Sequence, residues 1–215
     1  MKRAIVIFSG GPDSTTLLYL TMRRGYEVHP ITFNYGQLAK KELEAAERIS
    51  NLLGLKLKII DLNSLRELFL GITSLVDERI PITEGFSKQL IVPFRNGIML
   101  SIAIAYAQSM GAKYVFYGAQ GSDVPFYPDC RPKFIKAFQR SARLGTDDKL
   151  IIRAPLIKMR KSEVIRLGSK LGVPFELTWS CYRNGERHCG ICESCINRKR
   201  AFMEAGIRDP TEYEI

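Results

Sequence analysis

The stretch FSGGPDSTTL, residues 8–17, follows an apolar run at residues 3–8 and opens a segment of helix-forming residues. An unbroken apolar run is typical of a strand buried on both faces of a parallel sheet. Gly10 and Gly11 let backbone N–H groups approach an anion closely, because no Cβ intervenes. Pro12 suits the first turn of a helix, whose N-terminus carries partial positive charge. The junction therefore predicts a phosphate cradle.

Side chains of the same junction fit this reading. Ser9, Ser14, Thr15 and Thr16 offer hydroxyl donors to phosphate oxygens. Asp13 is the exception, because a carboxylate repels a bare anion, and it is explained if a magnesium ion lies between it and the phosphates. The sequence is neither a Gly-Lys-Ser/Thr P-loop nor a GxGxxG dinucleotide turn. The simpler alternative is a glycine turn followed by an ordinary capped helix.

Strand-like and helix-like segments alternate along the chain. Strands are predicted at residues 3–8, 27–35, 56–62, 113–118 and 149–156, and helices at 13–24, 38–54, 96–111, 132–145 and 160–172. This alternation predicts an α/β fold, a doubly wound and mostly parallel Rossmann-like sheet that binds ligands beyond the carboxyl ends of its strands. Pro30 weakens the second strand. Residues 63–92 carry few signals and suggest a flexible flap.

Composition sets wider limits. The 215 residues are 46% hydrophobic, enough for a substantial core, and the N-terminus has no signal-peptide pattern. No apolar stretch reaches the ~18–20 residues of a membrane span. We therefore expect a cytoplasmic protein with no membrane partner.

The net charge is +10, and residues 131–170 hold twelve Lys and Arg against three Asp and Glu. That segment is either a solvated surface or a face that attracts phosphates, an anionic substrate or RNA.

The pattern of alternating strand-like and helix-like segments does not continue after residue 178. We predict a nucleotide-binding domain at residues 1–178 and a small module with the C-terminal tail at 179–215. The module contains Cys181, Cys189, Cys192 and Cys195 in the spacing C-x7-C-x2-C-x2-C. Four clustered thiolates without an export signal predict a closed, structural zinc site, and an iron–sulfur cluster is the alternative. His188 is interpreted as a surface histidine.

The motif SGGPDS resembles the pyrophosphate loop of the ATP pyrophosphatases, which include GMP synthetase, NAD synthetase and tRNA thiolation enzymes. The resemblance implies an adenine nucleotide alpha hydrolase-like fold and cleavage of ATP between its α and β phosphates. A substrate oxygen then becomes an adenylate, and the loop holds magnesium pyrophosphate.

Further motifs narrow the resemblance. SGGPDSTT, YGQ (35–37), VPFRN (92–96), YPDC (127–130), APLIKMRKSE (154–163) and the four-cysteine tail follow one another in this order. The order resembles the family of 7-cyano-7-deazaguanine synthases. It implies an ATP-dependent ligase that converts 7-carboxy-7-deazaguanine and ammonia to the nitrile, with ATP, Mg²⁺ and Zn²⁺ as cofactors. It also implies a homodimer without a stable nucleic acid partner.

The resemblance carries residue roles onto matching positions. The implied catalytic residues are Asp13, Ser14, Arg95 and Lys161. The implied nucleotide-binding residues are Phe8, Ser9, Gly10, Gly11, Asp13, Ser14, Thr15, Thr16 and Gly118. The implied substrate-binding residues are Tyr35, Gln37, Asn96, Asp123 and Asp129. Structural roles stay open for several of these: a salt bridge and helix cap for Arg95 and Asn96, turn caps for the two aspartates, and a solvated side chain for Lys161.

The chain departs from the family pattern at Pro12, at Phe94 (glycine is usual there) and at residues 122–126. Candidates to stack on a planar ring are Phe94, Phe126, Tyr127 and Trp179.

Three other functions stay open for this sequence. The first is a tRNA-thiolating enzyme that uses Cys130 as sulfur carrier. The second is an enzyme that conjugates a deazaguanine to a protein, and the third is a nucleotide sensor with a zinc module.

Overall fold

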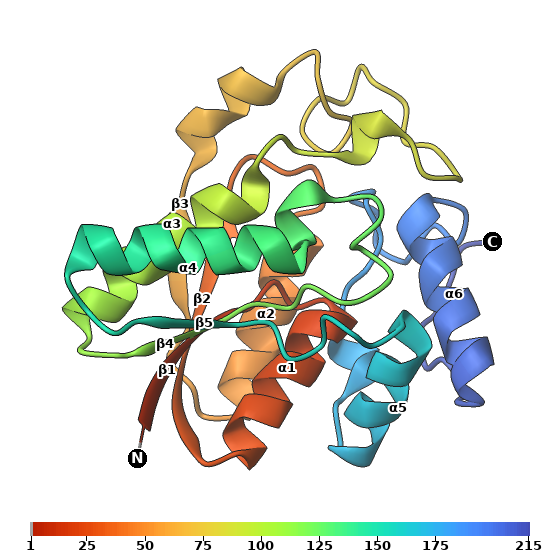
Figure 1. Cartoon of the computed structure of the whole chain (residues 1–215). Coiled ribbons are helices and arrows are strands. Elements are labelled where there is room, and N and C mark those ends of the chain that lie inside the picture. Colours follow the sequence, from red (N-terminus) through yellow and green to blue (C-terminus); the bar gives the residue numbers. More distant parts are fainter. Residues whose placement is uncertain (1) are drawn as a thin grey trace.

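A computed structural model describes residues 2–215 and contains a five-stranded, fully parallel sheet in the order β3-β2-β1-β4-β5 (Figure 1). The strands are β1 (Lys2–Ile7), β2 (Tyr26–Asn34), β3 (Lys58–Asp61), β4 (Tyr114–Phe116) and β5 (Ile151–Arg153). The α-helices are α1 (Pro12–Arg23), α2 (Lys41–Leu52), α3 (Arg95–Ser109), α4 (Pro132–Thr146), α5 (Lys161–Lys170) and α6 (Glu193–Ala205). Short 3-10 helices are η1 (Asn63–Phe69), η2 (Lys88–Leu90), η3 (Pro128–Cys130) and η4 (Phe175–Leu177). The predicted fold class is confirmed.

Alternate residues of β1 face opposite layers of the molecule. Ala4 and Val6 belong to a core shared with α1, α2 and α5. Ile5 belongs to the core on the other face, which α3 covers and on which α4 packs. Because both faces of the strand are buried, the run RAIVIF is apolar throughout rather than alternating.

The strand order reverses direction between β1 and β4. β2 and β3 lie on one side of β1, and β4 and β5 lie on the other. In a doubly wound sheet, the loops that leave such a pair of strands diverge toward opposite faces and open a crevice at the carboxyl ends. The glycine-rich junction leaves β1 at this position.

Strands β3, β4 and β5 are shorter than predicted. Strand β2 forms as predicted and contains Pro30. This proline lies opposite Val6 of β1, but β3 pairs with β2 only from Ile31 onward. At Pro30, β2 is therefore an edge on one side, so the missing N–H costs no ladder bond there.

The segment between β3 and α3 is anchored in the core rather than lying loosely on it. Phe69, Val76 and Leu90 are buried against the sheet. The buried Asp77 accepts a hydrogen bond from the Gly71 N–H at 2.8 Å. Whether part of this segment moves as a flap stays a prediction.

One stretch, Lys88–Ser109, has the length and mean hydropathy (1.5) of a membrane span, so the expectation that no stretch qualifies is wrong by this criterion. The buried core helix of a globular domain meets the same criterion. Leu100, Ala103 and Ala107 of α3 are buried against the sheet. Helix α3 is therefore part of the hydrophobic core of this domain.

The C-terminal segment packs on the rest of the chain at two places. Phe202 of α6 meets Phe175 edge to face, with ring centroids 5.0 Å apart, beside Ile165 of α5. The Trp179 N–H donates to the Gly10 carbonyl at 3.0 Å. The cysteine segment is thereby tied directly to the glycine-rich turn, and the domain boundary at residue 178 stays a prediction.

Candidate active site

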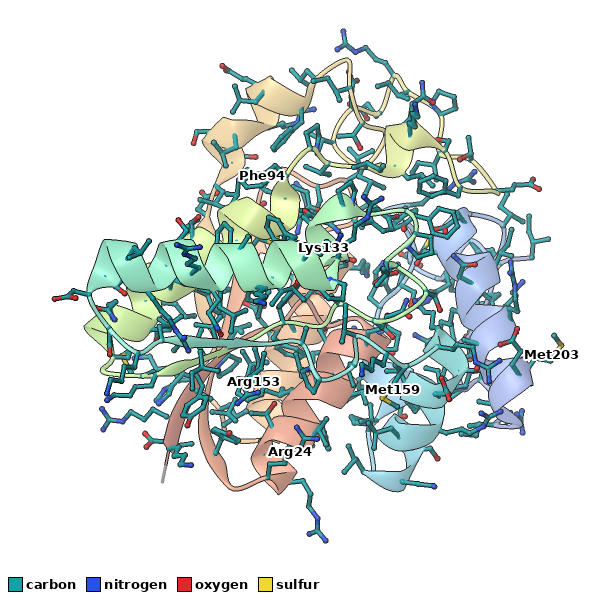
Figure 2. The ribbon with its side chains drawn as sticks, viewed as in Figure 1. Arg24, Phe94, Lys133, Arg153, Met159 and Met203 are labelled. Atoms are coloured by element: carbon teal, nitrogen blue, oxygen red, sulfur yellow. The ribbon has the colours of Figure 1, made fainter. Side chains whose placement is uncertain are left out.

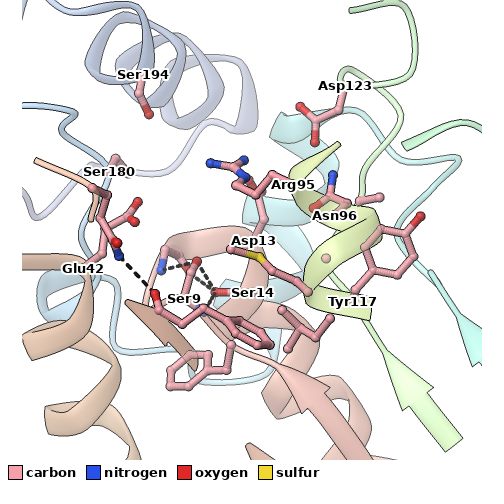
Figure 3. A pocket seen from close by; sticks show the side chains of 18 of the residues that line it. Ser9, Asp13, Ser14, Glu42, Arg95, Asn96, Tyr117, Asp123, Ser180 and Ser194 are labelled. Carbon is pink, nitrogen blue, oxygen red and sulfur yellow. Dashed lines mark hydrogen bonds between the residues drawn. The ribbon is translucent and has the colours of Figure 1, made fainter. Parts of the chain in front are cut away.

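A cavity of about 250 Å³ lies at the carboxyl ends of β1, β2 and β4, where the strand order reverses (Figure 3). The fold brings together most of the residues singled out from the sequence. Those that line the cavity are Phe8, Ser9, Gly11, Asp13, Ser14, Tyr35, Gln37, Arg95, Asn96, Gly118, Asp123 and Lys161.

The glycine-rich loop closes on itself through its own hydroxyls. The Ser9 N–H donates to Ser14 Oγ at 3.2 Å, and Ser14 Oγ donates to the Gly11 carbonyl at 3.1 Å. Gly11 precedes α1 without a side-chain cap, so the first N–H groups of the helix are not taken up by a capping oxygen. An anion at this end would meet those N–H groups and the helix dipole.

Gly10 does not line the cavity, and its role is to admit α2. Its backbone has φ of 81°, and a Cβ there would lie 2.6 Å from the Ala46 nitrogen and 2.6 Å from the Glu42 carbonyl oxygen. Both contacts are with backbone, which cannot swing aside. Only glycine therefore allows the first turns of α2 to pack against the loop.

Three other predicted residues also lie outside the lining. Thr15 donates its hydroxyl to the Gly11 carbonyl at 2.8 Å, and Thr16 is buried within α1. Asp129 accepts the Asn96 backbone N–H at 3.0 Å and so caps the first turn of α3, whereas the structural role left open for it from the sequence was a turn cap. It thereby holds the N-terminus of α3, and with it Asn96, at the cavity wall.

Charged groups from three elements converge beside the loop. Lys161 Nζ donates to Asp13 Oδ2 at 3.1 Å, and Asp123 lies close enough for burial and the Asp13 charge to raise its pKa to about 6. Gln120 Nε2 donates to Asp123 Oδ1 at 2.9 Å. Asp13 Oδ1 is buried and has no hydrogen-bond partner within residues 2–215. That orphaned oxygen fits a ligand of a hard cation such as Mg²⁺.

The opposite wall is formed by the start of α3. Arg95 Nη1 donates to the Tyr35 hydroxyl at 3.1 Å, and Asn96 Nδ2 donates to Cys130 Sγ at 3.4 Å. Phe94 precedes them in the left-handed region, with φ of 53°. Its exposed ring lies 5.9 Å from that of Phe134 on α4, outside the cavity (Figure 2).

Of the four aromatic candidates, Tyr127 and Trp179 line the cavity, whereas Phe94 and Phe126 are exposed outside it.

Burial raises the pKa of the Cys130 thiol to about 12. A thiol that stays protonated is a poor nucleophile. The raised pKa therefore disfavours Cys130 as a sulfur carrier.

The four cysteines of the tail form one buried cluster. Their Sγ atoms all lie within 4.8 Å of one another, and those of Cys189 with Cys195 and of Cys181 with Cys192 are 4.0 Å apart. Cys181 Sγ also accepts backbone N–H groups of Arg183 at 3.3 Å and Cys189 at 3.4 Å. Thiolates this close fit a single tetrahedral ion better than a four-iron cluster, in which each thiolate bonds a different iron.

Comparison with known proteins decides the family. Residues 3–206 match the family described as Queuosine biosynthesis protein QueC. The chain belongs to the QueC family. Among curated relatives, a protein named 7-cyano-7-deazaguanine synthase from Caldicellulosiruptor bescii is 45% identical over 99% of this chain and 98% of its own length. One of the same name from Methanoculleus marisnigri is 44% identical over the full length of both chains.

Solved structures support the fold of this QueC-family chain. A 4-thiouridine synthetase in complex with RNA and ATP superposes with a TM-score of 0.57 over 95% of this chain and 50% of its own. At 17% identity, that likeness extends to the fold alone. The family predicted from the motifs is confirmed.

The interpretation of His188 as a surface residue is wrong. Its ring packs against Trp179 with centroids 4.2 Å apart, and Nε2 accepts the Ser180 N–H at 3.0 Å. Burial and the Arg198 charge lower its pKa to about 4, so the ring is neutral. Its neighbours come from a segment without clear periodicity, which is why the sequence did not reveal this packing.

Sequence reasoning missed several lining residues of this QueC-family site. They are Glu42, Tyr117, Ser180, Tyr182 and Ser194. Glu42 lies on an amphipathic helix, whose charged residues are ordinarily predicted to face solvent. Its position five residues beyond the YGQ motif, at the carboxyl end of a predicted strand, was the available signal.

Proposed function

We propose that this chain converts 7-carboxy-7-deazaguanine, ammonia and ATP to 7-cyano-7-deazaguanine, AMP and pyrophosphate. One observation carries the proposal: full-length identity of 45% to a relative named for this synthase. The cavity supports it, because the glycine-rich loop, the Asp13–Lys161 pair and a wall of aromatic and amide side chains share one site.

The loop side of the cavity suits the triphosphate of ATP. Free N–H groups at the start of α1 and the Lys161 ammonium would face the β and γ phosphates, which leave as pyrophosphate. Mg²⁺ would be held by Asp13 and would neutralise phosphate charge. The residues would thus stabilise the charge that develops as the α phosphorus is transferred to a carboxylate oxygen.

The other side suits a planar heterocycle. Tyr127 and Trp179 offer aromatic faces, and Asn96 and Asp123 offer hydrogen-bonding groups for a guanine-like edge. The side-chain amide of Gln37 is instead bound to the backbone, because its Oε1 accepts the Tyr35 N–H at 2.9 Å and its Nε2 donates to the Phe33 carbonyl at 3.2 Å. Arg95 would face the substrate carboxylate or the α phosphate. Binding both substrates in one cavity supplies the positioning on which such a transfer depends.

The same site would act twice. The first adenylation turns a carboxylate oxygen into a good leaving group, and ammonia displaces AMP to give an amide. A second adenylation, now of the amide oxygen, lets AMP leave again and yields the nitrile. Each step activates an oxygen on the same carbon, so no second site is needed.

We further propose that the cysteine cluster holds Zn²⁺ and that the protein works as a cytoplasmic homodimer on free ammonia. The cluster is buried and closed by its own four thiols, which supports a structural ion rather than a catalytic one. Zinc would order a segment whose core is formed by the ligands and a few aromatic rings.

The test is incubation with ATP, Mg²⁺, ammonium and 7-carboxy-7-deazaguanine, followed by mass spectrometry. The expected products are the nitrile and AMP. Release of ADP in place of AMP, or turnover that survives in Asp13→Ala, would overturn the proposal. An RNA filter-binding assay at rising salt separates it from a tRNA-modifying function, for which salt-sensitive RNA affinity is expected.

A further inference from the structure

The proposed reaction needs a base beside the reacting nitrogen. Ammonia is present mostly as ammonium at neutral pH, and ammonium has no lone pair with which to attack a carbon. The conversion of an amide to a nitrile also removes both N–H protons. A group that accepts protons close to this nitrogen would therefore serve both halves of the reaction.

Three carboxylates line the cavity, and two of them are already engaged. Asp13 pairs with Lys161 at 3.1 Å, and Asp123 accepts a hydrogen bond from Gln120 at 2.9 Å. The carboxylate of Glu42 receives no hydrogen bond or ion pair from any side chain in residues 2–215. It is the carboxylate left free to exchange protons with a ligand.

The position of Glu42 is fixed by the packing of α2. The first turn of this helix lies on Gly10, where no Cβ intervenes, so Glu42 enters the cavity beside the phosphate loop. Figure 3 shows Glu42 and Ser180 on one side of the cavity and Asp123 on the other, with Asp13 between them.

The surroundings of Glu42 favour proton exchange near neutral pH. The titratable groups that share its cavity are Asp13 on α1, Tyr35 after β2, Arg95 on α3, Lys161 on α5, Tyr182 beside the cysteine cluster, and Tyr117, Asp123, Tyr127 and Cys130 after β4. Burial raises the pKa of Glu42 to about 7, and the Arg95 charge opposes that rise. A base whose pKa lies near the working pH is suited to general acid–base chemistry.

We propose that Glu42 is a catalytic residue that takes protons from the nitrogen in both halves of the reaction, an assignment that rests on the proposed function. In the first half, ammonium gives a proton to the Glu42 carboxylate, the freed nitrogen lone pair bonds to the acyl carbon, and the carbon–oxygen bond to AMP breaks. A second proton leaves the nitrogen to give the amide.

In the second half, the amide oxygen is adenylated, the nitrogen gives its two remaining protons to Glu42 in turn, and the carbon–oxygen bond to AMP breaks. The nitrogen electron pairs become the additional carbon–nitrogen bonds of the nitrile. Glu42 passes each accepted proton to water before the next transfer. No oxidant or further co-reactant is required.

The test compares two nucleophiles on the acyl adenylate. Hydroxylamine is mostly neutral at pH 7, so its attack needs no prior deprotonation, whereas ammonium depends on a base. We expect Glu42→Gln to lose about 10²-fold or more in kcat/KM for ammonium at pH 7. Hydroxamate formation with hydroxylamine stays close to wild type, which also shows that the variant is folded and adenylates its substrate.

Raising the pH to 9 supplies free ammonia and should narrow the deficit of Glu42→Gln. Glu42→Asp should keep part of the ammonium activity, and Glu47→Gln, on the exposed face of the same helix, should behave as wild type. Equal losses with both nucleophiles, or none with ammonium, would overturn the assignment. A wild-type enzyme that forms no hydroxamate would overturn the proposed function, and the assignment with it.

Discussion

Lys161 Nζ lies 3.1 Å from Asp13 Oδ2, which joins the first residue of α5 to the first turn of α1 across 148 positions of sequence. The pair brings two helix N-termini to one edge of the cavity. Both present partial positive charge there, and the lysine adds a full one. This positive charge favours binding of a polyanion beside Asp13 when a cation is bound to the Asp13 carboxylate.

Lys161→Met is expected to lower kcat/KM by about 10²–10³-fold, because it removes a charge aimed at the leaving pyrophosphate. Lys161→Arg should retain more activity. Steady-state AMP release measures both, and the exposed Lys158→Met is the matched control. Wild-type activity in Lys161→Met would contradict the role given to the pair.

The two loop glycines should respond differently to alanine. Gly10→Ala meets backbone atoms at 2.6 Å and a left-handed φ, so we expect a loss of at least about 2 kcal/mol in the free energy of unfolding. Gly11→Ala meets its nearest atoms at 3.4 and 3.5 Å and should stay within about 1 kcal/mol of wild type. It should instead weaken ATP binding. Urea unfolding and ATP titration separate the two effects, and a fully stable Gly10→Ala would refute the packing argument.

Stability at different pH values reports on Glu42 without any assay of turnover. A carboxyl whose pKa is raised to about 7 in the folded state binds more protons there than in the unfolded chain at pH 5–7. Its contribution to stability is therefore present at low pH and is lost as the pH rises from about 4.3 to about 7. Glu42→Gln, which stays neutral, should have a higher Tm than wild type at pH 8 and about the same Tm at pH 4.5. Parallel Tm curves for the two proteins would contradict this.

The cysteine cluster should be required for order in the C-terminal segment. Cys192→Ser is expected to reduce bound zinc to well below one ion per chain and to lower Tm, since structural zinc contributes directly to folding. Cys130→Ser should retain the zinc, because Cys130 belongs to the cavity and not to the cluster. Metal analysis with circular dichroism checks both variants. Iron in place of zinc would favour the alternative cofactor.

Local signals in the sequence identified most of the fold. Each predicted strand exists, and the apolar run of β1 is buried on both faces as its composition indicates. The ends of β4 and β5 were overestimated, because apolar residues continue past the strand into loops that are buried by tertiary contacts. Such burial leaves no mark on the local pattern.

The sequence identified residues that line the cavity where one loop supplies them and missed residues where distant segments meet. Asp13 and Ser14 follow from the glycine junction alone. Glu42 and Ser194 require knowledge that α2 and the start of α6 face the same cavity. The capping role of Asp129 likewise depends on where α3 begins in space.

We infer that the loop after β1 directs transfer of the AMP moiety of ATP to an oxygen of the substrate carboxylate. The most direct measurement uses 7-carboxy-7-deazaguanine labelled with ¹⁸O in its carboxylate, with the products analysed by mass spectrometry. We predict unlabelled nitrile and AMP that carries the ¹⁸O on its phosphorus. Label in pyrophosphate, phosphate or water, with unlabelled AMP, would contradict the account.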